Sequence, residues 1–98
     1  MERKAVLITT DKRGVFMGYA TQDSIDNSMK DGVIECNDIR MCVYWSSDVK
    51  GVIGLAAVGP SESCKITKAS PSGKLNGITA VLEITEQARE NWESEPWG

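Results

Sequence analysis

Runs of β-branched and aliphatic residues open the chain and predict a hairpin. The first run covers residues 4–9 and the second covers residues 15–21, while residues 11–14 between them have the composition of a turn. Gly18 interrupts the second run, which indicates a bulge or a close approach by another backbone. We therefore expect two antiparallel strands at the start of the chain.

The apolar pattern disappears after this hairpin, between residues 22 and 32. Asp, Ser, Asn and Lys dominate the segment, and its apolar residues Ile25 and Met29 stand alone, four residues apart. This composition predicts a loop that holds one helical turn rather than a strand.

Two strand-like runs return at residues 33–36 and 39–45. Asn37 and Asp38 separate them, and the side chains of both residues bond readily to their own backbone, which is typical of a turn. We therefore expect a second pair of strands here, which gives the sheet four strands in the first half of the chain.

The second half of the chain predicts two helices and further strands. Apolar residues repeat at helical spacing over residues 48–58, with serine and aspartate N-caps at the start and Gly59 and Pro60 at the end. Beyond this helix we expect a strand at residues 63–68, a turn or flexible loop at 70–74, a strand at 78–84 and a helix at 86–94. The chain, residues 1–98, is thus predicted to be a single α+β domain, with a mainly antiparallel sheet of about five to six strands and two short helices.

Length and composition limit the class of protein. The chain has 98 residues, of which 41% are apolar and 26% are charged, which is typical of one folded domain. The net charge of −3 argues against a protein that binds duplex nucleic acid, because such a protein gathers Lys and Arg on one face. One small anion needs only a local cluster. No apolar stretch predicts a membrane span or a signal peptide, so we expect the protein in the cytoplasm.

The sequence offers little to an enzyme. It contains no histidine, which removes the commonest general base and every Ser-His or Cys-His pair. Its three cysteines form no Cys-x-x-Cys pair and lie in strand-like surroundings, where reduced cysteine is a small buried hydrophobe. Carboxylates remain as candidate acids and bases, but no spacing fixes two of them on one site. We expect no enzyme activity, no metal and no cofactor.

The end of the fourth expected strand has the chemistry to bind a flat, anionic ligand. A base can stack on Tyr44 or Trp45. The N–H groups after Ser47 and the guanidinium of Arg40 can take a phosphate. The alternative is structural: Trp45 packs with Val43 in the core, and Tyr44 is an ordinary outward strand residue. Both interpretations stay open on these residues alone.

A second candidate for ligand binding is the segment at residues 72–77. Its first glycine, Gly73, leaves N–H groups exposed, Lys74 can reach a phosphate, and Asn76 can pair with the edge of a base. The alternative is a plain hairpin turn that ends in Asn-Gly.

Five short motifs occur in order along the chain. They are Gly14-Val15-Phe16-Met17-Gly18 in the hairpin, Arg40 through Tyr44-Trp45 on a strand, Leu55-Ala56-Ala57-Val58-Gly59 at a helix end, Glu62-Ser63-Cys64-Lys65, and Thr85-Glu86-Gln87-Ala88 at the last helix. With these motifs the chain resembles a set of small phage-encoded proteins, the first family of Thoeris anti-defence proteins. The resemblance covers most of the chain, although Ile66 stands where an aromatic residue is expected.

The resemblance implies a non-enzymatic phage sponge that binds a nucleotide immune signal without cleaving it. The ligands of that family are isomers of cyclic ADP-ribose and, in some members, cyclic oligonucleotides of the kind that CBASS immunity uses. A homo-oligomer is also implied, from a dimer up to a hexamer, with ligand pockets between subunits in the host bacterial cytoplasm. Trp92 and Trp97 near the end of the chain favour self-association independently.

The resemblance also implies site residues. An arginine on the central strand, an aromatic that stacks on adenine and an asparagine near the last strand hold the ligand in that family. The matching positions here are Arg40, Tyr44 or Trp45, and Asn76, with Arg89 on the last helix as a further candidate. With the residues chosen by their chemistry, the candidate ligand-binding set is Arg40, Tyr44, Trp45, Ser47, Lys74, Asn76 and Arg89.

Two other classes of function remain as alternatives. One is a phage inhibitor that binds a host defence protein directly, as an anti-CRISPR protein does, with an acidic surface that covers a basic nuclease patch. The other is an enzyme that degrades a nucleotide through carboxylates, which the missing histidine disfavours.

Overall fold

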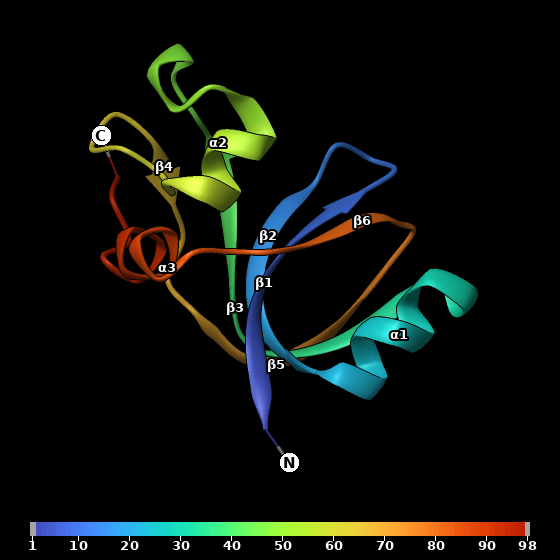
Figure 1. The fold of residues 1–98 in the computed structure, drawn as a ribbon. Helices are drawn as coiled ribbons and strands as arrows, with labels where there is room; N and C mark the ends of the chain where they lie inside the picture. The colour runs from blue at the N-terminus through green and yellow to red at the C-terminus, as the bar shows by residue number, and fades with distance from the viewer. Residues whose placement is uncertain (1, 98) are drawn as a thin grey trace.

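Six strands form one antiparallel sheet within residues 2–97, the part of the chain that the computed structural model describes (Figure 1). The elements in chain order are β1 (Arg3–Thr10), β2 (Val15–Thr21), α1 (Gln22–Asp31), β3 (Val33–Tyr44), the short 3₁₀ helix η1 (Ser47–Val49), α2 (Gly51–Ala57), β4 (Lys65–Ile66), β5 (Ser70–Asn76), β6 (Ile78–Glu83) and α3 (Glu86–Glu93). The predicted α+β fold and its mainly antiparallel sheet are confirmed.

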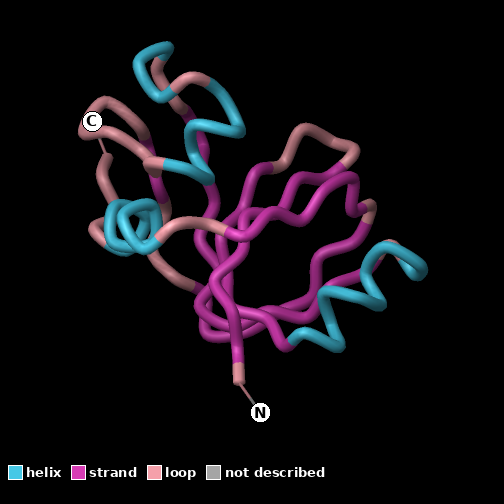
Figure 2. Tube along the Cα trace, viewed as in Figure 1, coloured by secondary structure: helices cyan, strands magenta, loops and turns pink. Residues whose placement is uncertain are grey.

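The sheet curls so that its edge strands β5 and β6 come together at one corner. Its strand order is β4-β3-β2-β1-β6, and the long strand β3 pairs with β5 along its first half and with β4 near its end. Only Gly77 separates the edge strands β5 and β6 in sequence, and it makes this corner with a φ of 67°, which favours glycine. The carbonyl of Gly77 accepts the N–H of Asp11 at 2.9 Å. Figure 2 shows the strands curving round into an open ring.

Two apolar clusters lie on opposite faces of this sheet. Successive residues of β1 divide between them, because Val6 and Ile8 join one cluster and Leu7 joins the other. The first cluster includes Ile34 and packs against Ile25 of α1, which lies across one side of the ring. The second cluster lies beneath α2 and α3 and includes the fully buried Trp92.

Helix α3 completes the hydrogen bonding at the end of α2. The carbonyl oxygens of residues 55–58 accept hydrogen bonds of 2.6 to 3.1 Å from the side chains or backbone of Thr85, Asn91 and Trp92. A helix leaves its last carbonyl groups without partners in its own turns. Thr85 at the N-cap of α3 and the side chains of Asn91 and Trp92 supply the missing donors, so the two helices are fixed to each other.

Residues 22–31 form α1, so the prediction of a loop with one helical turn there was wrong, and so was the count of two helices. Thr21 caps the helix, because its Oγ1 accepts the N–H of Ser24 at 3.2 Å. Gly32 ends it with a φ of 73°. Ser28 is fully buried. A small polar residue therefore occupies a buried position of the helix that pattern reasoning assigns to an apolar residue.

Strand β3 is continuous from Val33 to Tyr44, so the predicted turn at Asn37 and Asp38 was also wrong. Asp38 has a φ of 52° and the pairing of β3 with β2 shifts register nearby, as in a β-bulge. The bulge exchanges the faces of the strand. Cys36 belongs to the cluster beside α1, whereas Cys42, six residues later, belongs to the cluster beneath α2 and α3.

Three further predictions change in part. Residues 70–74 were expected to form a turn or flexible loop, but they belong to β5 and pair with β3. The helix expected at residues 48–58 divides into η1 and α2, because Lys50 and Gly51 take φ values of 65° and 75°. The strand expected at residues 63–68 shortens to β4, while the β1–β2 hairpin, β6 and α3 are confirmed. None of the helices formed by residues 2–97 has the length and apolar character needed to cross a lipid bilayer.

Candidate functional site

Two of the predicted ligand-binding residues line one hollow. Lys74 and Asn76 at the end of β5 meet Lys12 of the β1–β2 turn and Phe16 of β2 around a volume of about 290 Å3. Thr10, Asp11 and Leu75 complete the lining. The hollow thus combines two ammonium groups, one carboxylate, an amide, a hydroxyl and an aromatic ring.

The turn that carries Lys12 is fixed by backbone hydrogen bonds. The N–H of Thr10 donates to the carbonyl of Gly14 at 2.9 Å, and the N–H of Gly14 donates to Thr10 Oγ1 at 3.1 Å. Asp11 joins the same turn to the corner between β5 and β6 through its bond to Gly77. These bonds hold the two sides of the hollow together, so Lys12 and Asn76 project from a connected frame.

Lys74 is held only weakly in its present position. Its Nζ lies 3.4 Å from Glu35 Oε1, and both side chains are exposed. Exposed ion pairs contribute about 0–1 kcal/mol, so a phosphate competes readily for this ammonium group. Lys74 also lines a neighbouring hollow of about 310 Å3 with Arg3 and Asn37.

Arg40 lies elsewhere and already has a carboxylate partner. Its Nε donates to Glu95 Oε2 at 2.9 Å, and its side chain is only 12% exposed. Its Nη1 donates to the carbonyl of Asp38 at 3.4 Å. Arg40 does not line the hollow that contains Lys74 and Asn76. Its guanidinium is therefore paired with a carboxylate of the segment that follows α3.

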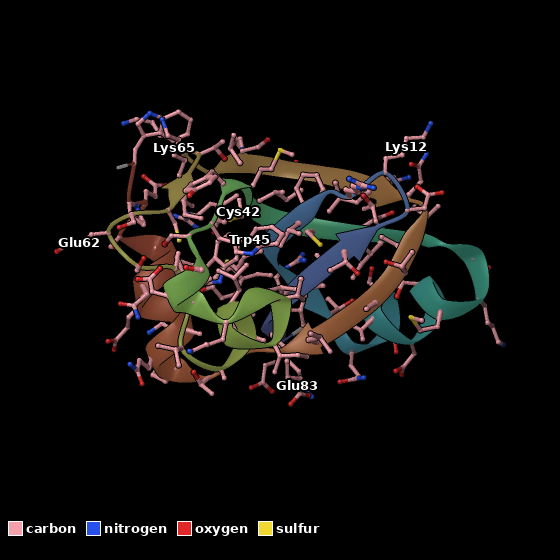
Figure 3. All side chains as sticks on the ribbon, turned by 90° about the horizontal axis from the view of Figure 1, so that it is seen from above. Lys12, Cys42, Trp45, Glu62, Lys65 and Glu83 are labelled. Atoms are coloured by element: carbon pink, nitrogen blue, oxygen red, sulfur yellow. The ribbon has the colours of Figure 1, made fainter. Side chains whose placement is uncertain are left out.

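Tyr44, Trp45 and Ser47 lie at the far end of β3. Tyr44 is 52% exposed and pairs with Lys65 of β4, as the outward interpretation expects. Trp45 is partly buried and packs against the cluster that contains Cys42 (Figure 3). Val43 is 51% exposed, so its predicted place in the core was wrong.

Ser47 begins the 3₁₀ helix η1 rather than a longer α-helix. The N–H groups of Val49 and Lys50 donate to the carbonyls of Ser46 and Ser47 at 3.2 and 3.3 Å. Two of the donors that were expected to bind a phosphate are therefore engaged within the turn.

Arg89 lies on α3 between two carboxylates. Its guanidinium forms ion pairs with Glu86 and Glu93, and Tyr19 donates its hydroxyl to Glu93 Oε2 at 2.8 Å. Burial raises the pKa of Tyr19 above its ordinary value. Arg89 lines a separate hollow of about 340 Å3 with Tyr19 and Lys4. The two carboxylates neutralise its charge, which reduces its attraction for an anion.

A larger hollow, of about 560 Å3, lies between α2, residues 58–62 and α3. In the sequence, Asp48 is a helix cap and one of several scattered carboxylates, and Asn91 lies on the inward side of the last predicted helix. The three segments meet only in the folded chain, and the one local signal is the pair Gly59 and Pro60, which was interpreted as a helix end.

The three cysteines are buried and carry free thiols. Burial raises the pKa of Cys36 and Cys42 to about 11, so both thiols are protonated at neutral pH. Across residues 2–97, no group of three or more Cys, Asp or Glu side chains is arranged to hold a metal ion.

The fold and its hollows define a small α+β domain with a curled antiparallel sheet and an ionic hollow at the corner of that sheet. The model of a protein family matches residues 3–92, and the chain belongs to this family, which is described as a domain of unknown function, DUF6948. No curated protein and no solved structure matches the chain. The resemblance to Thoeris anti-defence proteins therefore stays a prediction.

Proposed function

We propose that the protein binds a small anionic nucleotide and sequesters it without cleaving it. The observation that carries the proposal is the single hollow lined by Lys12, Phe16, Lys74 and Asn76. The chain as a whole is acidic, with a net charge of −3, so a pair of ammonium groups beside an aromatic ring and an amide is a local departure that suits a nucleotide.

Each group has a distinct role in this proposal. Lys12 and Lys74 bind phosphate oxygens through charge-assisted hydrogen bonds, and Asn76 pairs with the edge of the base. The half-buried ring of Phe16 offers a stacking surface, and stacking contributes about 1–3 kcal/mol per base. Asp11 accepts a ribose hydroxyl. None of these groups is an activated nucleophile, so the ligand leaves the protein intact.

The size of the hollow favours a site completed by a second copy of the chain. A volume of about 290 Å3 lies just below the range for small-molecule sites, which is about 300–1,000 Å3. Phe16 pairs with Met41 of β3, which is exposed, and Val43 on the same strand is exposed as well. These apolar side chains provide a surface for a homo-oligomer, from a dimer up to a hexamer, in which the hollow lies between subunits.

The ligand class of the proposal is that of cyclic ADP-ribose isomers and cyclic oligonucleotides. The protein then acts as a phage anti-defence sponge in the cytoplasm of the host bacterium, where it lowers the concentration of an immune signal. Support for this finer assignment comes from the resemblance of the five motifs, together with the nucleotide-like chemistry of the hollow.

The test is ligand depletion followed by recovery. The purified protein is mixed with a panel of cyclic ADP-ribose isomers and of cyclic di- and trinucleotides, and free ligand is measured by chromatography before and after heat denaturation. We expect one ligand to disappear and to return unchanged on heating. A new chemical species would contradict sequestration, and no depletion of any ligand would direct the search to protein partners.

Three variants locate the site. We expect Lys74→Ala and Asn76→Ala each to weaken binding about tenfold or more, because each removes a direct hydrogen bond to the ligand. Lys30→Ala is the matched control, since Lys30 is an exposed lysine on α1 outside the hollow. Equal losses in Lys74→Ala and Lys30→Ala would indicate only general charge attraction.

A further inference from the structure

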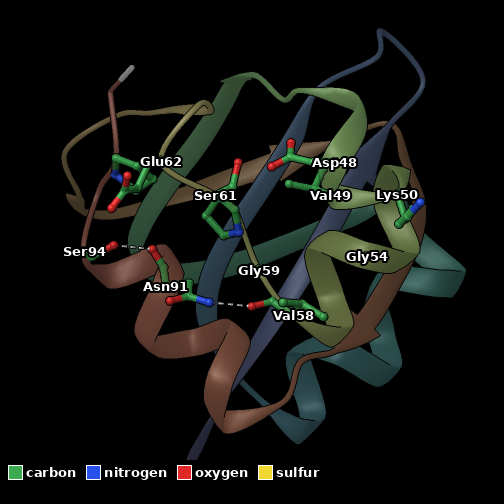
Figure 4. Close-up of a pocket in the computed structure, with 12 residues that line it drawn as sticks. Asp48, Val49, Lys50, Gly54, Val58, Gly59, Ser61, Glu62, Asn91 and Ser94 are labelled. Atoms are coloured by element: carbon green, nitrogen blue, oxygen red, sulfur yellow. Dashed lines mark hydrogen bonds between the residues drawn. The ribbon is translucent and has the colours of Figure 1, made fainter.

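The hollow of about 560 Å3 beside α2 has the form of a second ligand-binding site (Figure 4). Val49, Val58 and Pro60 form apolar walls, and Asp48, Ser61 and Asn91 supply polar groups. Figure 4 shows the carboxylate of Asp48 directed toward the side of the hollow where Ser61 lies. A concave apolar surface with a few converging polar groups is the usual form of a small-molecule site.

The floor of this hollow is rigid. Gly59 has a φ of 91°, and a Cβ atom there would lie 2.9 Å from the Cα and carbonyl oxygen of Ala88. The backbone therefore passes directly over α3 with no room for a side chain. Asn91 Nδ2 donates to the carbonyl of Val58 at 2.7 Å and fixes the adjacent wall. A ligand meets a preformed surface here and loses little binding energy to reordering of the protein.

The charges around the hollow favour a cation. Asp48 and Glu62 contribute two carboxylates, against one ammonium from Lys50. None of these three side chains forms an ion pair with another group of residues 2–97. The Asp48 carboxylate accepts a hydrogen bond from Ser46. Hydrogen bonds from Ser46 and Ser61 hold the pKa of this carboxyl below its usual range, so it is charged at neutral pH and keeps lone pairs for one further donor.

We propose that this hollow binds an organic cation, an amine or guanidinium group carried on an aliphatic stem. The charged group binds the free edge of the Asp48 carboxylate, beside Ser61, and Glu62 adds to the negative potential. The stem packs against Val49 and Val58. Such a ligand is either a free amine metabolite or an arginine or lysine side chain of a protein partner, because both present the same chemistry.

This site is independent of the proposed nucleotide site. It shares no lining residue with the hollow of Lys12 and Lys74, and its charge preference is opposite. Glu62 and Lys12 lie toward opposite ends of the molecule in Figure 3. Lys74→Ala therefore leaves cation binding unchanged, and failure of one proposal does not decide the other.

The first experiment compares two ligands of the same shape and different charge. The full-length protein is titrated with n-butylguanidinium and with n-butylurea, its neutral counterpart, and backbone amide signals are followed by NMR. We expect saturable shifts at Gly59, Ser61 and Asn91 with the guanidinium ligand and none with the urea. Equal responses to both ligands, or shifts that do not saturate, would overturn the proposal.

Matched variants separate the hollow from general surface charge. We expect Asp48→Asn to weaken guanidinium binding about tenfold, because one charge-assisted contact is lost. Asp26→Asn removes an exposed carboxylate on α1 and serves as the control. Val58→Trp fills the hollow from a half-exposed position and abolishes binding while thermal unfolding stays near that of the parent. If Asp26→Asn weakened binding as much as Asp48→Asn, the proposal would fail.

The source of the cation is decided by two more titrations. Spermidine represents a free amine, and acetyl-Gly-Arg-Gly-amide represents an arginine side chain in a protein. Tighter binding of spermidine assigns the site to a metabolite, whereas tighter binding of the peptide assigns it to a protein partner. No saturable binding of either probe would contradict the proposed ligand chemistry.

Discussion

Arg40 Nε and Glu95 Oε2 lie 2.9 Å apart and join strand β3 to the segment that follows α3. The same carboxylate oxygen accepts the N–H of Ala69 at 3.2 Å, just before β5. The Arg40 side chain is 12% exposed and that of Glu95 is 26% exposed, so the pair is partly removed from water. One ion pair therefore connects three separate parts of the chain.

We expect Arg40→Ala to destabilise the fold by about 1–3 kcal/mol, because the substitution leaves Glu95 half-buried without its cation. The measurement is the free energy of unfolding in urea. Lys4→Ala is the control: Lys4 and Glu83 form an exposed pair at 3.4 Å, and its loss should cost less than about 0.5 kcal/mol.

The same variant decides between two roles of Arg40. If Arg40 is a structural residue, nucleotide binding by Arg40→Ala stays near that of the parent under conditions where the variant is folded. A folded Arg40→Ala protein that has lost nucleotide binding would show instead that Arg40 holds the ligand, as the resemblance implies.

We expect Phe16→Leu to weaken nucleotide binding with little effect on stability. Leucine preserves most of the apolar contact of Phe16 with the cluster beside α1, but it removes the aromatic face. Stacking is worth about 1–3 kcal/mol per base, so the dissociation constant should rise by a factor of about 5 to 150. Isothermal titration measures it. Unchanged affinity would show that the base lies away from Phe16.

Helix α1 and strand β3 show which parts of the fold could not be predicted from the sequence. The hairpin and α3 follow from local patterns, since their apolar spacing and N-caps lie within a few residues. Helix α1 presents a serine, Ser28, at its buried position, so it has too few apolar residues to give a helical pattern. In β3, Asn37 and Asp38 have the composition of a turn. Asp38 forms a bulge instead, and the strand continues through it. Both features depend on tertiary contacts.

The residues of the candidate site were also predictable only in part. Lys74 and Asn76 were found from their chemistry, because a lysine and an amide near glycines are visible in the sequence. Lys12 and Phe16 were not found, since they reach the hollow only when the curled sheet brings the β1–β2 turn to the end of β5. Likewise, no local pattern in the sequence indicates that Glu95 forms an ion pair with Arg40.

We expect Val43→Glu to weaken self-association without unfolding the chain. Val43 is half-exposed on β3, so a charged side chain there meets solvent in the monomer but would lose water in an apolar interface. Sedimentation velocity measures the change in oligomeric state. Ile53→Glu is the control, because Ile53 is an exposed apolar residue on α2. If both variants dissociated the oligomer equally, β3 would not be the specific interface.

We expect Trp92→Phe to cost about 1–3 kcal/mol of stability. Trp92 is fully buried, and its Nε1 donates to the carbonyl of Leu55 at 3.1 Å. Phenylalanine reduces the buried area and leaves that carbonyl without its donor. Urea denaturation provides the measurement. Trp97→Phe is the control, since Trp97 is 59% exposed, and it should change stability by less than about 0.5 kcal/mol. Equal losses would contradict the role of the buried hydrogen bond.

The buried thiol of Cys36 makes stability depend on alkaline pH. Burial raises its pKa in the folded state to about 11, whereas the pKa of an unfolded thiol is about 8.5. The folded state therefore binds more protons than the unfolded state between these values. The contribution of the Cys36 thiol to stability is fully present below about pH 8.5. Up to about 3 kcal/mol of it is lost as the pH rises toward 11.

Cys36→Ala tests this linkage. The variant has no thiol at this position, so its free energy of unfolding should decline less steeply between about pH 8.5 and 10.5 than that of the parent. All other ionisable groups are the same in both proteins, so the difference between the two slopes isolates the thiol. Parallel slopes would mean that the Cys36 thiolate reaches water in the folded state, in conflict with the burial of its side chain beside α1.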